Sequence, residues 1–235
     1  MNSLRLSFCL LLPATLLPAV SVAQAVPKTA KKMSAVLQES AETVKMPPVF
    51  REAAADGAGF PQTGRVLWRL HADKSGKVVR REQKADPALA KQAAALKPPA
   101  AFPPRERCVL LPQAGGATES VCRNIPFIAE QEVYFLIPRN LTADKTRFSA
   151  ALETVTPQPA YPARSLEREE KGMVRVRFAI GTDGRAHGTS VEKSSGYRLL
   201  DRAAVKAMDS ARFRPATFRG RPVWMRAARS FDFDY

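Results

Sequence analysis

The chain has 235 residues and a formal net charge of +15, with 37 Lys and Arg against 22 Asp and Glu. A chain of this length holds one or two small domains. The basic residues are spread along the sequence and no nucleic-acid-binding motif occurs, so we expect no nucleic acid partner. Anionic envelope surfaces suit this charge, and a merely solvated surface explains it equally well.

Residues 1–25 have the pattern of a targeting segment. Arg5 is a short basic region, residues 6–22 are apolar and uncharged, and Ala23 and Ala25 offer a cleavage site of the A-x-A type. We therefore expect a cleaved signal peptide and a periplasmic location. An uncleaved inner-membrane anchor is the alternative, although a span needs about 20 apolar residues and this run is slightly shorter.

Residues 26–50 are expected to form a short helical segment. Their apolar residues recur at helical spacing, which is typical of an amphipathic helix, and two prolines then end it. The apolar positions are Met33, Val36, Leu37, Ala41 and Val44, and the prolines are Pro47 and Pro48.

Residues 51–140 contain two cysteines, Cys108 and Cys122, on the arms of a predicted hairpin around Gly115 and Gly116. In an exported chain this arrangement favours a disulfide, and reduced thiols are the alternative. Closing a loop of this size stabilises a chain by about 3 kcal/mol in the chain-entropy model. No histidine lies near the cysteines, so we expect no metal site.

The clearest pattern lies in residues 157–235. Val174, Val176 and Phe178 alternate with other residues, and period two with β-branched side chains is typical of a half-buried strand. An Asp-Gly pair then predicts a hairpin, and apolar residues at helical spacing predict a helix. The expected order is strand, hairpin, strand, helix, strand, over residues 172–181, 183–184, 186–193, 197–211 and 223–233. The fold class is therefore α+β, with a three-stranded antiparallel sheet packed on helices.

Short motifs at fixed spacings run through the same region. In chain order they are Gln158-Pro159-Ala160-Tyr161-Pro162, Gly172 with Val174, Val176 and Phe178, Asp183-Gly184, Ser194-Ser195-Gly196, Leu200-Asp201 with Ala203, Phe213 with Pro215, Gly220 with Pro222-Val223, and Phe231 with Phe233. Together they resemble the C-terminal domain of TonB-family energy transducers.

In that family the last strand receives the TonB box, a short peptide of outer-membrane receptors, by β-strand addition. The resemblance implies a set of partner-binding residues, namely Gln158, Pro159, Tyr161, Pro162, Val223, Trp224, Met225, Arg226 and Arg229. A plug of the core is the alternative role for Tyr161. The family's membrane anchor also carries a serine and a histidine that couple to a proton-driven motor, whereas no histidine precedes His71 in this chain.

The middle of the chain repeats the C-terminal pattern. Residues 64–76 align with residues 172–184, since 172 − 64 and 184 − 76 are both 108, and Phe102 falls on Phe213 at an offset of 111. We interpret this as a divergent copy of the same fold, and chance similarity of two small α+β segments is the alternative. The expected domains are a signal peptide over 1–25, the helical segment over 26–50, the divergent copy with its disulfide over 51–140, a linker over 141–156 and the TonB C-terminal-like domain over 157–235.

The sequence contains no recognisable catalytic constellation. The two histidines, His71 and His187, have no Ser, Cys or carboxylate at a motif spacing, and we interpret both as surface residues. No phosphate-binding glycine loop and no calcium loop occurs. We therefore expect no enzyme activity, no cofactor and no small-molecule substrate.

The leading interpretation is a periplasmic protein-binding module that engages outer-membrane receptor peptides by β-strand addition in transmembrane transport. The alternative is a soluble envelope protein that uses the fold without energy transduction. Such a protein would bind other envelope proteins, or a second copy of itself through its strand edges. A divergent, membrane-anchored transducer is the third interpretation.

Overall fold

The computed structural model describes residues 41–112 and 118–234, which belong to one unit, Ser40–Tyr235. The predicted signal peptide, residues 1–25, lies outside the described residues. No helix in the described part of the chain is long and apolar enough to cross a membrane.

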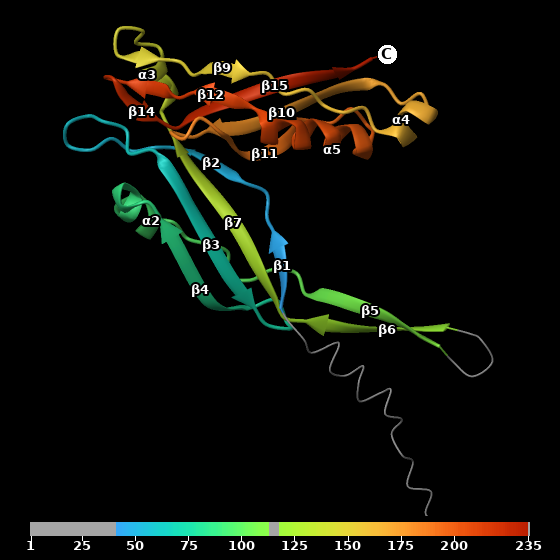
Figure 1. Cartoon of the computed structure of the whole chain (residues 1–235). Coiled ribbons are helices and arrows are strands. Elements are labelled where there is room, and N and C mark those ends of the chain that lie inside the picture. The colour runs from blue at the N-terminus through green and yellow to red at the C-terminus, as the bar shows by residue number, and fades with distance from the viewer. Residues whose placement is uncertain (1–40, 113–117, 235) are drawn as a thin grey trace, which may run out of the picture. The chain divides into compact units, whose positions relative to one another are not determined.

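The first sheet is built around the long strand β7 (Phe127–Leu136). β3 (Gly64–Ala72) pairs with β7 in antiparallel fashion, and β4 (Val78–Ala85) pairs with the far side of β3. The other edge of β7 is occupied by two short parallel strands, β1 (Glu42–Lys45) and β2 (Val49–Glu52). The order is therefore β1-β7-β3-β4, with β2 beside β1 along β7 (Figure 1).

The helix predicted over residues 26–50 is wrong where the structure describes it, since β1 and β2 replace it there. Residues 26–40 of that prediction lie outside the described part. Val44 and Met46 both pack against the core, so burial follows a period of two rather than a helical period. Pairing with β7 satisfies the main chain of this segment, and that non-local interaction overrides the local apolar spacing.

One face of the first sheet is covered by a short helical stretch, the 3₁₀ helix η1 (Pro87–Leu89) followed by α2 (Ala90–Ala94). Leu89 and Ala93 on this stretch are fully buried against alternate residues of β3. Each fully buried side chain of Leu size stabilises the fold by roughly 1.5–3 kcal/mol. The two helical pieces follow Asp86 directly and together span only residues 87–94.

The predicted hairpin in the middle of the chain is formed by β5 (Arg105–Pro112) and β6 (Thr118–Ile125). Cys108 lies directly opposite Cys122 in its register, and their sulfur atoms are bonded at 1.98 Å. The predicted disulfide is confirmed. Among the described residues, β5 and β6 pair only with each other, so this ribbon is an addition to the sheet rather than a part of it.

The second sheet has the elements that the sequence predicts. β10 (Gly172–Ile180) is central, with β11 (Ala186–Lys193) on one side and β15 (Met225–Phe233) on the other, all antiparallel. The helix α5 (Arg198–Ala207), followed by η2 (Met208–Ser210), packs its buried residues against one face of this sheet. The α+β character predicted for this part is thus present in the structure.

The stretch expected to be a linker, residues 141–156, contributes strands to the second half of the molecule. β8 pairs with β13, and β9 pairs with β12, so these residues extend the C-terminal domain instead of only leading into it. The remaining elements are α3 (Arg139–Thr142), β8 (Phe148–Ser149), β9 (Leu152–Val155), α4 (Ala163–Glu167), β12 (Arg212–Arg214), β13 (Ala216–Phe218) and β14 (Arg221–Val223).

The two sheets share one strand order, β7-β3-β4 and β15-β10-β11, and β3 pairs with β7 in the same register as β10 with β15. The central strands β3 and β10 are both nine residues long, and each begins at a glycine. Both hairpins need a glycine with positive φ, 86° at Gly76 and 72° at Gly184. The carbonyl of Gly76 accepts the N–H of Phe102 at 2.8 Å, and that of Gly184 accepts the N–H of Phe213 at 2.9 Å.

An aromatic cluster joins the two sheets. Tyr134 at the end of β7 stacks on Phe50 with ring centroids 5.6 Å apart, and lies 5.7 Å from the ring of Trp224. The N–H of Ile137 donates to the carbonyl of Trp224 at 2.9 Å. Burial raises the pKa of the Tyr134 phenol above its ordinary value, and its hydrogen bond to Glu132 adds to this rise. The cluster therefore consists of neutral, well-packed rings.

Candidate functional site

The candidate site is the outer edge of β15. This strand pairs with β10 along its full length, and no strand in the described part of the chain pairs with its other side. Phe231 and Phe233 point into the core, whereas Arg226 and Ala228 lie on the opposite, exposed face. An edge strand with unpaired N–H and C=O groups is a template for another extended chain.

A cavity of about 810 Å³ lies along the first half of this edge. Residues 225–228 line one side of it, and apolar side chains that include Phe50, Ile137 and Phe148 line the other parts. An extended segment of a few residues is of the size that such a cleft accepts.

Arginines dominate the polar lining of the cavity: Arg139, Arg175, Arg177 and Arg226. The Arg175 Nε is already paired with a Glu192 carboxylate oxygen at 2.7 Å. Arg177 and Arg226 lie over the ring of Phe50, with their guanidinium carbons 5.6 and 5.9 Å from its centroid. Within the described residues neither of these two has a carboxylate partner.

The structure places the partner-binding residues expected from the resemblance in different parts of the domain. Met225 and Arg226 lie on the edge and line the cavity. Gln158 and Pro162 line a different, shallower pocket beside α5. Pro159 lies between them in a half-buried position.

Tyr161 is positioned as a plug of the core. Its ring packs edge-to-face on Phe233, with centroids 5.5 Å apart, and its hydroxyl donates to the carbonyl of Glu170. This is the alternative role that the sequence left open for this tyrosine. Any contact with a partner would involve only its exposed fraction.

Val223 and Trp224 precede the open edge rather than forming it. Val223 is fully buried and pairs with Ala216 of β13. Trp224 is 9% exposed, belongs to the aromatic cluster, and its main-chain N–H donates to the Thr63 hydroxyl at 3.1 Å. Both residues are therefore already held by the fold.

Arg229 points to the core face of β15. Its Nη1 donates to a Glu153 carboxylate oxygen at 2.6 Å, and both side chains are about 30% exposed. The guanidinium also lies 5.4 Å from the ring of Phe231. Arg229 thus ties β9 to β15, whereas Arg226 is the arginine that faces the cavity.

Sequence reasoning missed Phe50, Arg139 and Arg177 as cavity residues. Phe50 reaches the cavity because β2 pairs with β7, which no local pattern indicates. Arg177 occupies the exposed face of a strand whose buried face carried the recognisable pattern. Only the alternation of that strand could have placed Arg177 on the same face as Arg226.

The two histidines have carboxylate partners that the sequence did not indicate. His71 lies 3.2 Å from Glu82, and His187 lies 3.0 Å from Asp183 and packs on Trp224. Partial burial raises the pKa of the Asp183 carboxyl, but hydrogen bonds from His187 and from the main chain outweigh it and hold this pKa below its ordinary value. Both histidines are partly exposed, and each is paired with a carboxylate.

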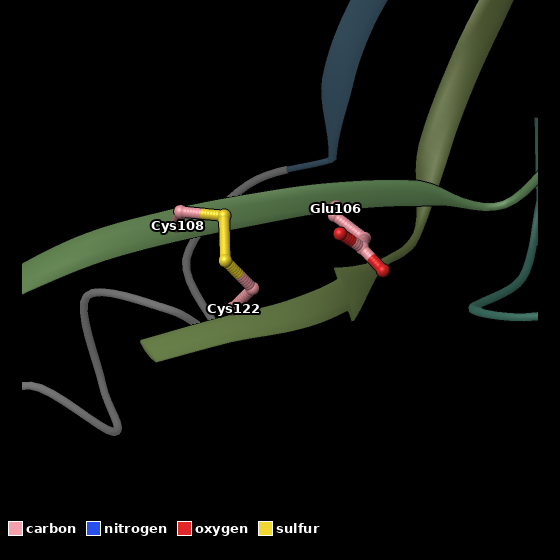
Figure 2. Close-up of side chains that lie close together, drawn as sticks. All are labelled: Glu106, Cys108 and Cys122. Carbon is pink, nitrogen blue, oxygen red and sulfur yellow. A yellow bond between two sulfur atoms is a disulfide. The ribbon is translucent and has the colours of Figure 1, made fainter. Parts of the chain in front are cut away.

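Glu106 lies beside the disulfide on the ribbon, as Figure 2 shows, and its carboxylate is within 4.8 Å of both sulfur atoms. All three residues are exposed. A metal ion would require thiolates, and the bond between Cys108 and Cys122 leaves no thiolate to bind one.

Comparison with known proteins points to one family. Residues 157–235 match the family model for the C-terminal region of the Gram-negative bacterial TonB protein. Protein TonB of Neisseria gonorrhoeae is 44% identical over 57 residues, covering 24% of this chain and 20% of that protein. Protein TonB of Haemophilus influenzae is 38% identical over 73 residues, covering 30% of this chain and 27% of that protein.

A solved structure, the solution NMR structure of the Pseudomonas aeruginosa TonB CTD, is 30% identical. The match covers 37% of this chain and 88% of the chain of that structure, with a TM-score of 0.32. The matched part of this chain spans about a fifth to a quarter of the length of the curated relatives named above.

Proposed function

Because residues 157–235 belong to the TonB C-terminal domain family, we propose that this chain is a periplasmic protein-binding module. Its open strand β15 would receive an extended peptide of an outer-membrane receptor in transmembrane transport. Main-chain hydrogen bonds would supply affinity, and alternate side chains would supply specificity.

The proposal includes a divergent copy of the same fold in residues 51–140. Its support is the shared strand order, the shared register and the equivalent glycine turns of the two sheets. Phe127 of β7 pairs with Ala72 of β3, and Met225 of β15 pairs with Ile180 of β10 in the same way. At the other end of these strands, Phe135 pairs with Gly64 and Phe233 pairs with Gly172. Equivalent residues of β7 and β15 therefore differ by 98 positions, since 225 − 127 and 233 − 135 are both 98.

The proposal is supported by a difference between the two equivalent edges: the edge of β7 is paired and the edge of β15 is open. β1 pairs with residues 127–130 of β7, and the equivalent residues 225–228 of β15 line the open cavity. The chain thus adds one of its own segments to the first edge and leaves the second edge for another chain. Because β1 and β2 run parallel to β7, we expect the partner peptide to run parallel to β15.

The test is a titration of the oxidised, mature chain with receptor-derived TonB-box peptides, followed by amide NMR. Shifts should concentrate on residues 225–233. A spin label on the peptide N-terminus should broaden residues 225–228 more than residues 231–233, because parallel pairing places the peptide N-terminus near the start of β15. The opposite gradient would refute the parallel orientation, and absence of any shift at millimolar peptide would refute the receptor-peptide role.

One observation favours the alternative, a soluble envelope protein that binds other envelope proteins without energy transduction. The C-terminal domain is not joined to the rest by a flexible linker alone. Trp224 packs on Tyr134, and part of the linker expected over 141–156 is paired into sheets. A pair of identical chains joined at their β15 edges is a further possibility within this alternative. Sedimentation of the mature chain at micromolar concentration would reveal it as a dimer.

A further inference from the structure

The exposed face of the first sheet carries a row of alternating charges across its strands. Arg69 on β3 has Glu130 of β7 opposite it on one side and Glu82 of β4 on the other. The Arg69 Nε donates to the Glu130 carboxylate at 2.8 Å. The resident strand β1 continues the row, because its Lys45 lies opposite Glu130.

The equivalent row on the second sheet lacks its carboxylates. Arg177 occupies the place of Arg69, since 177 − 69 is 108, and its cross-strand neighbours are Ala228 of β15 and Ser190 of β11. Its Nε donates only to the Ser190 hydroxyl, at 3.2 Å. Both positions that hold a carboxylate around Arg69 are thus neutral around Arg177.

The missing carboxylates leave a cationic face beside the open edge. Arg226 lies on this face two residues before Ala228, and within the described residues it has no carboxylate partner either. Ala228 has no side chain beyond its Cβ, so no side chain of β15 separates Arg177 from the outer edge. Both arginines line the cavity at that edge.

We propose that the strand added to β15 carries carboxylate side chains on the face of Arg177 and Arg226, so that the partner of this site is an acidic, extended peptide. This rests on the proposed function. An added strand places alternate side chains on this face about 4.5–5.5 Å from their neighbours on β15, and diagonal neighbours remain within reach of long side chains. Carboxylates of the added strand would then supply the negative charges that Glu130 of β7 and Glu82 of β4 supply beside Arg69 on the first sheet.

The same comparison separates this peptide from the chain's own β1 segment. On β7 the added strand presents Lys45 to Glu130, whereas the equivalent position on β15 is the neutral Ala228, with Arg177 and Arg226 beside it. A lysine at the contact position therefore fits the first edge and is repelled at the second. Loss of the carboxylate at the equivalent position, together with the nearby arginines, keeps the resident segment off β15.

The experiment measures binding of the oxidised, mature chain to three capped peptides that alternate valine with glutamate, glutamine or lysine. Fluorescence anisotropy gives the affinities at low ionic strength. The glutamate peptide should bind about 2- to 30-fold more tightly than the glutamine peptide, as expected for two opposite-charge cross-strand pairs. The lysine peptide should bind most weakly, and added salt should reduce the difference.

Variants assign the effect to the two arginines. Arg177→Gln and Arg226→Gln should each remove part of the preference for glutamate, and Arg226→Glu should shift the preference towards lysine. Arg202→Gln is the matched control, because it removes the same charge from the exposed side of α5 and should leave the preference unchanged. Equal loss of preference in Arg202→Gln would overturn the assignment to this face.

A backbone N-methylated glutamate peptide distinguishes this inference from the strand-addition proposal. N-methylation removes main-chain donors and keeps the charges. If N-methylation abolishes binding but glutamate and glutamine peptides bind equally, strand addition stands and the charge inference is overturned. If the N-methylated peptide binds as well as its parent, strand addition fails and this inference fails with it.

Discussion

Two glycines show how single residues govern the contact between the sheets. Gly188 on β11 has φ of 59°, and a Cβ there would lie 2.5 Å from Tyr134 Cε2 and 3.1 Å from Pro48 Cβ. Gly196 has φ of 93°, but a Cβ there would meet nothing within 4 Å. Both positions need the left-handed region, but only Gly188 also needs the space.

We expect Gly188→Ala to destabilise the chain more than Gly196→Ala. In both variants alanine must adopt a positive φ, which destabilises the folded state by more than about 1 kcal/mol. Gly188→Ala also pushes Tyr134 away, and overpacking of this kind costs roughly 1–3 kcal/mol in addition. Urea unfolding followed by near-UV circular dichroism measures both variants, and equal midpoints would contradict a tight contact at Gly188.

Asp183 makes stability depend on pH at the β10–β11 hairpin. In the folded state the pKa of Asp183 is held below its ordinary value. The carboxylate therefore adds to the free energy of unfolding above the pKa of the unfolded state, and this stabilisation is lost as the pH falls through the pKa of the folded state. Asp183→Asn should therefore lower the urea midpoint at pH 7 but have little effect at pH 2. A constant difference between the two proteins over this range would show that the carboxylate charge is not the cause.

Among the elements, the β5–β6 ribbon depends most on a covalent bond. It pairs with no other strand in the described chain and few of its described side chains are buried, so packing contributes little to it. The sequence predicted the hairpin and its disulfide because both are local features, a glycine loop between two cysteines. The parallel strands β1 and β2 were not predictable in the same way, because their partner lies more than 80 residues later.

Replacing both cysteines with serine should loosen the ribbon and leave the sheets intact. The chain-entropy model attributes about 3 kcal/mol to closing a loop of this size, and an isolated two-stranded hairpin is marginal without such help. Hydrogen exchange should become fast in β5 and β6 and stay slow in β3. Faster exchange in β3 as well would mean that the ribbon supports the sheet.

At the scale of the whole molecule, the aromatic cluster decides whether the two sheets unfold together. Trp224 joins Tyr134 of the first sheet and His187 of the second, and it is almost fully buried. Side chains placed in this way couple two cores that otherwise have separate residues. The cluster also holds Phe50 beside the open edge, and so connects stability to the candidate site.

Trp224→Ala should cost about 3–5 kcal/mol and separate unfolding into two transitions. The matched variant Trp68→Ala lies in the core of the first sheet alone and should lower the stability of that sheet without uncoupling the second. Calorimetry and far-UV circular dichroism measure the unfolding transitions of both variants. A single transition in Trp224→Ala would contradict the coupling role of the cluster.

The sequence by itself determined β10, β11, α5 and β15, because alternation, the Asp-Gly turn and helical spacing are all local signals. It also determined the disulfide and indicated the shared pattern of the two sheets. Only the tertiary structure decided which edge is filled and which is open, and which side chains surround the open one. Strand pairing between distant segments brings Phe50, Arg177 and Arg226 together, and such pairing depends on burial and main-chain satisfaction across the fold rather than on any local pattern.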